Sequence, residues 1–215
     1  MEEVKDEFFL PLVEQIYEKL KKEDCILTEA NRWRKPSEVL IGDEEIKKLI
    51  PNEDLQKFLG KEYISEKIKT KKSVLNKLGV RDFSIDDLIK CLEKIEWVKN
   101  QNWEWFVNLF SYLSKEKFSD EQLEQIKNLS IIKLEAGELT SINEGIVFFP
   151  LEEKVTYGFE NEIRVIKKDI IEIILKQGNK EEILEFFREL GLKKADPYEI
   201  IENHILPVYK SEIWK

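Results

Sequence analysis

The residues of this chain that could do chemistry are few and widely separated. Histidine occurs once, as His204, and cysteine twice, as Cys25 and Cys91. One histidine and two distant cysteines offer no pair of ligands at the short spacing that a zinc site uses. A lone histidine near the C-terminus is more often a capping or packing residue than a ligand. We therefore expect no metal site.

Acidic residues are abundant, and two adjacent pairs, Asp86-Asp87 and Glu44-Glu45, are candidates for acid–base catalysis. Both pairs fall in the predicted first turn of a helix, where negative charge meets the positive end of the helix dipole. General acid catalysis needs a carboxyl group shielded from water, and neither pair has an apolar setting. The chain also lacks a Gly-rich phosphate-binding motif. We predict no catalytic residue, no bound cofactor and no enzymatic activity.

Aromatic residues are concentrated in one segment that contains Trp97, Trp103 and Trp105. The spacing i, i+3, i+4, i+7 of its apolar residues favours a helix in the core; the residues concerned are Phe106, Leu109, Phe110 and Leu113. The alternative is a partner-binding surface, because tryptophan is enriched among the residues that dominate interfaces. Trp103 and Trp105 cannot both face inward on one helix, so at least one is expected to cover a surface.

A lysine-rich stretch is the best candidate for contact with nucleic acid. It contains Lys67, Lys69, Lys71 and Lys72, and Lys193-Lys194 holds a similar place later in the chain. Aromatic residues that could stack on bases are not interleaved with these lysines. The whole chain has a net charge of −9 and a pI of about 5.0, which repels a phosphate backbone. A solvated face is therefore favoured over a nucleic-acid contact.

The composition is that of a globular protein with a highly charged surface. Of its 215 residues, 42% are hydrophobic and 37% are charged, which excludes a disordered chain. The acidic start of the sequence has no signal-peptide pattern, and no apolar run approaches the roughly 20 residues that span a bilayer. We expect a soluble, cytoplasmic protein with reduced cysteines and no membrane partner.

The sequence contains an internal repeat. Ile26–Ile41 is echoed 106 residues later by Ile132–Val147, with Glu29-Ala30 matching Glu135-Ala136. A second echo lies 112 residues apart, where Leu78-Gly79-Val80 matches Leu190-Gly191-Leu192. Two similar segments indicate that the chain is built from two similar units.

Short β-prone runs among many helices predict an α+β fold that is mostly helical. In each unit we expect a β-hairpin and several helices in a winged-helix-like arrangement, with the units covering residues 1–114 and 115–215. The predicted strand pairs are Cys25–Thr28 with Glu38–Ile41 and Ser130–Leu134 with Ile146–Phe149. Helices are predicted over about 7–22, 85–95 and 102–114.

Three stretches resemble the region that follows the ATP-binding domain in sacsin-like and NO VEIN-like ATPases of the gyrase/histidine-kinase (GHKL) type. They are Trp33–Leu40, Leu78–Leu92 and Leu190–Pro207, the last reading LGLKKADPYEIIENHILP. The Asn-bearing helix, D-x-G-x-G turn and Gly-rich lid of the family's ATP site are missing from this chain. The resemblance therefore implies a non-catalytic segment that joins the nucleotide-driven head to other domains, in a chaperone-like or prokaryotic defence-related machine.

Three functions follow as hypotheses. The first is a non-enzymatic interaction or linker module, which transmits movement or binds a protein partner or other domains of the same ATPase. The second is a nucleic-acid-binding protein with tandem winged-helix-like units, which the net acidity disfavours. The third is a small enzyme with an unrecognised carboxylate site, whose sign would be a pocket that holds two buried acids.

Overall fold

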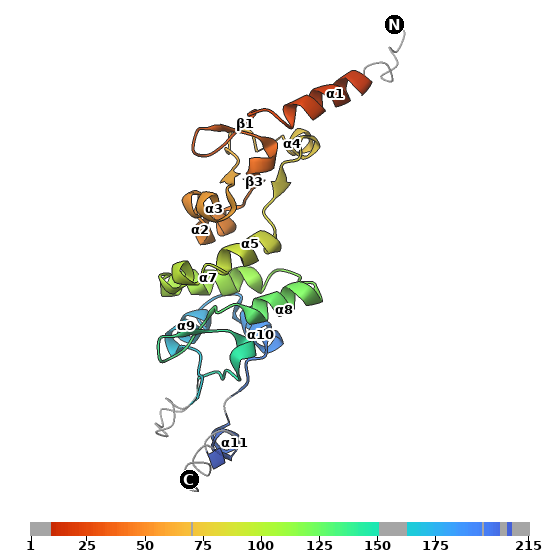
Figure 1. The fold of residues 1–215 in the computed structure, drawn as a ribbon. Coiled ribbons are helices and arrows are strands. Elements are labelled where there is room, and N and C mark those ends of the chain that lie inside the picture. The colour runs from red at the N-terminus through yellow and green to blue at the C-terminus, as the bar shows by residue number, and fades with distance from the viewer. Residues whose placement is uncertain (1–9, 70, 151–162, 195, 203–205, 208–215) are drawn as a thin grey trace. The chain divides into compact units, whose positions relative to one another are not determined.

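The computed structural model describes residues 10–69, 71–150, 163–194, 196–202 and 206–207. It confirms a mixed α+β fold that is mostly helical (Figure 1). Its contacts divide the chain into two compact units, Met1–Cys91 and Leu92–Lys215. This division differs from the predicted boundary after residue 114, because the aromatic helix packs against helices of the second unit. His204 lies outside the described residues.

The first unit alternates short helices with short strands. Its helices are α1 (Leu10–Leu20), α2 (Glu44–Leu49), α3 (Asn52–Leu59), α4 (Lys72–Leu78) and α5 (Ile85–Leu92), with a 3-10 turn η2 (Pro36–Glu38). Its strands are β1 (Ile26–Leu27), β2 (Trp33–Arg34), β3 (Val39–Ile41), β4 (Glu62–Tyr63) and β5 (Arg81–Asp82).

Strand pairing in this unit differs from the prediction. β1 pairs antiparallel with β2, whereas the run Glu38–Ile41 was expected to be its partner. β3 instead lies in the centre of a three-stranded parallel sheet of order β4-β3-β5. A strand buried on both faces is apolar throughout, and all three β3 residues are buried. The hairpin is closed within the polar link by Asn31, whose φ of 54° lies in the left-handed region that asparagine tolerates.

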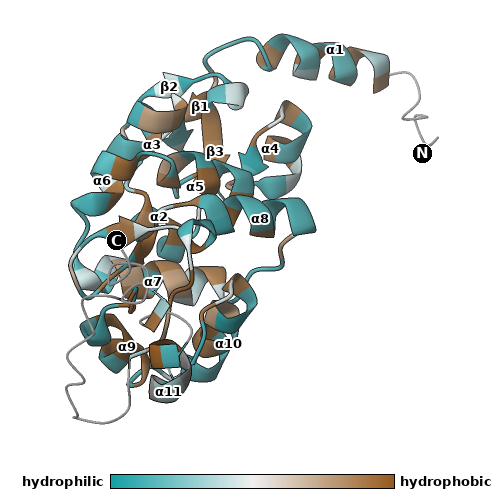
Figure 2. Cartoon of the chain, turned by 60° about the horizontal axis from the view of Figure 1, so that its bottom comes forward, coloured by the Kyte–Doolittle hydropathy of each residue, from teal (hydrophilic) through white to brown (hydrophobic). Residues whose placement is uncertain are grey.

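One core cluster of the first unit joins the strands to helix α4. It is formed by Ile26, Val39, Ile41, Ile64, Leu75, Leu78 and Val80. Helix α1 packs against this cluster through Tyr17 and Leu20, whereas Leu12 and Ile16 of the same helix remain exposed. Figure 2 shows this mixture of apolar and polar residues along α1 and the apolar character of β3.

The second unit is dominated by helices. They are α6 (Ile95–Lys99), α7 (Trp103–Leu113), α8 (Asp120–Asn128), α9 (Lys168–Ile174), α10 (Lys180–Leu190) and α11 (Pro197–Ile200), with a 3-10 turn η3 (Ile142–Glu144). Its strands are β6 (Ile132–Lys133) and β7 (Leu139–Thr140), which pair antiparallel. The predicted partner of β6, Ile146–Phe149, is again not the one observed: Phe148 bridges to Val165 and Lys193 instead.

Helix α7 is the central element of the second unit, as the spacing of its apolar residues predicts. It contacts both α9 and α10. Phe106 and Phe110 are fully buried, and the Phe110 ring meets Phe187 of α10 edge-on with 4.7 Å between ring centroids. Edge-to-face contact is a favoured geometry for aromatic pairs. Asn102 begins the helix by accepting a hydrogen bond from the Trp105 amide.

The two hairpins have the same backbone hydrogen bonds. The amide of Thr28 donates to the carbonyl oxygen of Arg32 at 2.9 Å, and that of Leu134 donates to Glu138 at 2.8 Å. Both pairs are related by the shift of 106 residues seen in the sequence. The left-handed residue in the second hairpin is Gly137, at the position of Asn31.

In each unit, one central strand residue pairs in parallel with residues of two other segments. Leu40 holds this position in the first unit, and Phe148 in the second. Their parallel partners are Tyr63 and Arg81 for Leu40, and Val165 and Lys193 for Phe148. The helix that precedes the last of these partners ends at a left-handed glycine in both units, Gly79 and Gly191. The winged-helix-like arrangement of each unit stays a prediction.

Among the residues that the structure describes, no helix has the length and apolar character needed to cross a membrane.

Candidate functional site

The single tryptophan of the first unit lies on strand β2 and is exposed. Trp33 is 61% exposed, and its cross-strand neighbour on β1 is Leu27. Successive side chains of an extended strand point to opposite faces, so Arg32 and Arg34 lie on the face opposite to Trp33. A large aromatic ring left in water is a common anchor for a partner protein.

A buried glutamate, Glu62 of β4, binds the opposite face of this hairpin. Its side chain is 2% exposed. Its carboxylate accepts hydrogen bonds from Thr28 Oγ1 at 2.7 Å and from Arg34 Nε at 2.9 Å. Arg32 Nη2 lies 2.8 Å from the same carboxylate and also donates to Gln56 of α3 at 2.9 Å. Glu62 therefore ties the hairpin to the sheet, and Arg32 also ties it to α3.

The charge of Glu62 is stabilised despite its burial. Burial by itself raises the pKa of this carboxyl group, but the hydrogen bonds from Thr28 and Arg34 and the charges of Arg32 and Arg34 lower it further than burial raises it. The net pKa lies below its ordinary value. Glu62 is thus an ionised anchor and is poorly suited to donate a proton.

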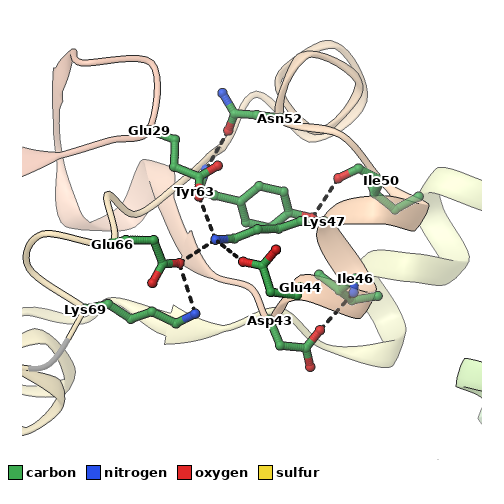
Figure 3. A network of polar contacts seen from close by, with 10 residues as sticks. All are labelled: Glu29, Asp43, Glu44, Ile46, Lys47, Ile50, Asn52, Tyr63, Glu66 and Lys69. Carbon is green, nitrogen blue, oxygen red and sulfur yellow. Dashed lines mark hydrogen bonds and ion pairs between the residues drawn. The ribbon is translucent and has the colours of Figure 1, made fainter.

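A second polar network surrounds Lys47 of α2 (Figure 3). Its ammonium group lies 2.6 Å from Glu29 and 2.5 Å from Glu66, with Glu44 at 3.7 Å. Lys69 binds the same Glu66 carboxylate at 3.1 Å. Burial lowers the pKa of Lys47, but the two short contacts raise it more, so the net shift is upward. The network joins the hairpin turn to α2 and to the segment after β4.

The acid pair Asp86-Asp87 begins helix α5, as expected for a first turn. Asp87 Oδ2 accepts from the amide and the hydroxyl of Ser84, and its carboxylate forms a two-point contact with the Arg81 guanidinium. Burial raises the pKa of Asp87, but the contacts with Arg81 and Ser84 outweigh it and lower the net value. Asp87 therefore serves as a cap and an ion-pair partner.

The resolved pKa shifts of the carboxyl groups are all in the direction that disfavours acid catalysis. Among the described residues, every carboxyl group with a resolved pKa shift has a lowered pKa; these are Glu18, Glu62, Glu66, Asp87 and Glu144. Burial raises the pKa of the Cys25 thiol, which keeps it protonated and weakly nucleophilic. The described part of the chain contains no group of three or more His, Cys, Asp or Glu residues that could hold a metal ion.

The three tryptophans considered for an alternative partner-binding surface lie in different settings within the second unit. Trp105 is 7% exposed and belongs to the core. Trp97 is half-buried and meets Trp105 edge-on, with 5.3 Å between ring centroids. Trp103 is half-buried, and the ammonium groups of Lys133 and Lys167 lie 4.5 and 5.1 Å from its ring centre. Trp97 and Trp103 thus retain exposed surface.

The lysines considered for an alternative nucleic-acid contact do not form one described surface. Lys67 and Lys71 are exposed between β4 and α4, and Lys72 is exposed at the start of α4, whereas Lys69 is paired with Glu66. Lys193 and Lys194 are exposed and belong to the second unit; Lys193 pairs through its backbone with Phe148. A carboxylate in the middle of the first group weakens it as a phosphate-binding stripe.

Sequence reasoning missed Trp33 and Glu62 as site residues. The signal that points to Trp33 is the internal repeat itself. Position 33 aligns with Leu139, and Arg32 and Arg34 align with Glu138 and Thr140. The second unit forms the same hairpin with different side chains at these positions. The hairpin fold therefore does not require Trp33, Arg32 or Arg34.

Comparisons with protein-family models, with curated proteins and with solved structures found no match to this chain. The resemblance to sacsin-like and NO VEIN-like ATPases therefore depends on the three sequence stretches alone.

Proposed function

We propose that this chain is a non-catalytic protein-interaction module, of the kind implied by its resemblance to the region after the ATP-binding domain of sacsin-like and NO VEIN-like ATPases. Its partner is another protein or another domain of the same ATPase. The observation that carries the proposal is the 61% exposed Trp33 on a hairpin held by a buried, ionised glutamate.

The position of Trp33 favours a binding role over a structural one. The corresponding residue in the second hairpin is Leu139, which is half-buried in the same pairing. A tryptophan is therefore not needed to form this hairpin. Most of its surface stays in water in the folded chain, so the larger part of its apolar burial is still available to a complex.

The anchoring by Glu62 favours tight binding because it orders the hairpin in advance. A flexible loop loses conformational entropy when it binds, and a preorganised one avoids much of that cost. Thr28, Arg32 and Arg34 all contact the same carboxylate, and each contact limits movement of the strand that presents Trp33. The described acids with shifted pKa values, which all stay ionised, support a role without proton transfer.

Site-specific crosslinking in cells tests the proposal. A photoreactive amino acid at position 33 of the full chain should give a discrete crosslinked product with one partner. The matched control is the same amino acid at Ser37, which is exposed in the neighbouring turn η2. The same products from both positions, or none from position 33, would contradict an interaction surface at Trp33.

The partner identified in this way then allows a quantitative test. Trp33→Ala should weaken binding of the purified partner by roughly thirtyfold, as expected for a hot-spot residue. Val74→Ala removes another exposed apolar side chain of the same unit, which is 42% exposed on α4, and should leave affinity unchanged. Equal effects of the two substitutions would argue against a specific role for Trp33.

Nucleic-acid binding is the competing outcome. A salt-dependent gel shift that is lost on replacing Lys67, Lys71 and Lys72 would favour it. An ATP-dependent rise in melting temperature would contradict a module without a nucleotide site.

A further inference from the structure

Two lysines and a tryptophan in the second unit form a positively charged site that the proposed interaction surface does not use. Lys133 lies on β6, and Lys167 directly precedes α9. The Lys167 amide donates to the Lys133 carbonyl oxygen at 2.8 Å, so the two residues are neighbours across the backbone. Both side chains reach Trp103, the first residue of α7.

The two ammonium groups lie close to one ring. Their distances from the Trp103 ring centre are 4.5 Å for Lys133 and 5.1 Å for Lys167, and Lys133 is also 5.6 Å from the centre of the Phe106 ring. Both lysines and Trp103 are half-buried. The face of an indole attracts a cation, but two cations at one ring repel each other. The ring therefore compensates the charge only in part.

No carboxylate of the described residues neutralises either lysine. This contrasts with Lys47 and Lys69 in the first unit, which both contact Glu66. The acid nearest to Lys133 in the sequence is Glu135, whose carboxylate instead accepts a hydrogen bond from the Lys168 amide at 2.8 Å. Two half-buried positive charges with no counterion among the described residues are unusual in a chain with a net charge of −9.

The fold does not require lysine at these positions. The equivalent hydrogen bond in the first unit joins the Ser65 amide to the Leu27 carbonyl oxygen at 3.0 Å. A leucine and a serine thus hold the same backbone pairing without any positive charge. The lysines of the second unit need an explanation other than strand pairing.

We propose that Lys133 and Lys167, gathered at Trp103, bind the phosphate group of a small phosphorylated molecule, for which inorganic phosphate is the simplest representative. A doubly charged oxyanion would neutralise both ammonium groups and accept hydrogen bonds from each. The lysine stems are long enough to adjust their ammonium groups around such an anion. This site is separate from the Trp33 surface, and neither proposal depends on the other.

The indole N–H signals of the ¹⁵N-labelled full chain provide the test. Trp103→Phe identifies the Trp103 signal by its loss. Titration with inorganic phosphate at constant ionic strength should shift this signal to saturation. Lys133→Met and Lys167→Met should each weaken the affinity roughly tenfold. Lys168→Met removes the next lysine, which contacts Glu172, and should change nothing.

Further arms distinguish the sources of the phosphate and guard against misfolding. Phosphoserine, used beside inorganic phosphate, shows whether an esterified phosphate is preferred; tighter binding of either compound supports the site if the two lysine variants weaken it. Lys133→Gln replaces Lys133→Met if the latter lowers the melting temperature. A Trp103 signal that does not saturate, or equal binding by wild type and the Lys133 and Lys167 variants, would overturn the proposal. Trp33→Ala should leave phosphate binding unchanged.

Discussion

The two units use the same backbone pairing with different side chains at equivalent positions. In the first unit, a buried acid, Glu62, holds two arginines below an exposed Trp33. In the second unit, the position of Glu62 is taken by Arg164, which contacts Glu144 at 3.1 Å, and the position of Trp33 is taken by Leu139. The charge at this position is therefore negative in the first unit and positive in the second.

This difference separates residues that the fold needs from residues that it tolerates. The left-handed turn residue, the helix-ending glycine and the buried apolar positions are kept in both units. The charges and the exposed ring are not kept. Function is therefore best sought at the positions that differ, which are Trp33 and Glu62 in one unit and the lysines at Trp103 in the other.

The largest expected effects are at the shared core positions. Phe187 of α10 is fully buried, and its counterpart in α4 is Leu75, which is 3% exposed. We predict that Phe187→Ala lowers the free energy of unfolding by about 4 kcal/mol and Leu75→Ala by about 3 kcal/mol. Denaturant unfolding measures both. A change below about 1 kcal/mol at either position would show that the units do not share this core position.

Removal of the buried acid should have a smaller effect, confined to the first unit. Glu62→Gln keeps the shape of the side chain but loses its charge contacts with Arg32 and Arg34, and we expect a loss of about 2 kcal/mol. The readout is hydrogen exchange at two equivalent amides, Glu29 and Glu135, which donate to Tyr63 and Val165. Faster exchange at Glu29 alone is expected, and equal acceleration at Glu135 would contradict a local effect.

Lowering the pH should reduce the stability of the first unit, because buried carboxylates in it lose their charge contacts. The pKa values of Glu62 and Asp87 are lowered in the folded state, so these groups contribute stability above the ordinary carboxyl pKa of about 4. That contribution is lost as the pH falls from there through their lowered folded values. We predict that the Glu62→Gln, Asp87→Asn double variant is less stable at pH 7 and less sensitive to acid. An unchanged acid profile would contradict the assignment.

The smallest effect concerns the hairpin turns. Gly137 has a φ of 92°, and a Cβ atom built there meets nothing within 4 Å, so only the backbone conformation opposes a side chain. Gly137→Ala should cost about 1 kcal/mol, whereas Gly137→Asn should cost less, because Asn31 adopts the equivalent conformation. Thermal unfolding compares the two variants. An equal loss for both would weaken the correspondence between the turns.

The sequence predicts the helices better than the strand pairs. The spacing of Phe106, Leu109 and Phe110 correctly predicts a core helix, and the capping pattern at Ser84 and Asp87 correctly predicts the start of α5. These signals are local. The partners of β3 lie more than twenty residues further along the chain, and a run of three apolar residues carries no information about which strand it will meet.

The candidate site was less predictable for a related reason. Nothing near Glu62 in the sequence marks it as buried, because its partners Thr28 and Arg34 come from a distant hairpin. The exposure of Trp33 depends on the same hairpin. The lysines at Trp103 likewise come from β6 and from the start of α9, and only the fold brings them to one ring.

The most direct test of the account is Trp33→Leu, which places in the first hairpin the residue that the second hairpin has at Leu139. The account predicts an unchanged melting temperature together with a roughly thirtyfold loss of affinity for the partner crosslinked at position 33. Undiminished affinity would contradict a binding role for the exposed ring, and a large drop in melting temperature would show that the fold itself requires tryptophan there.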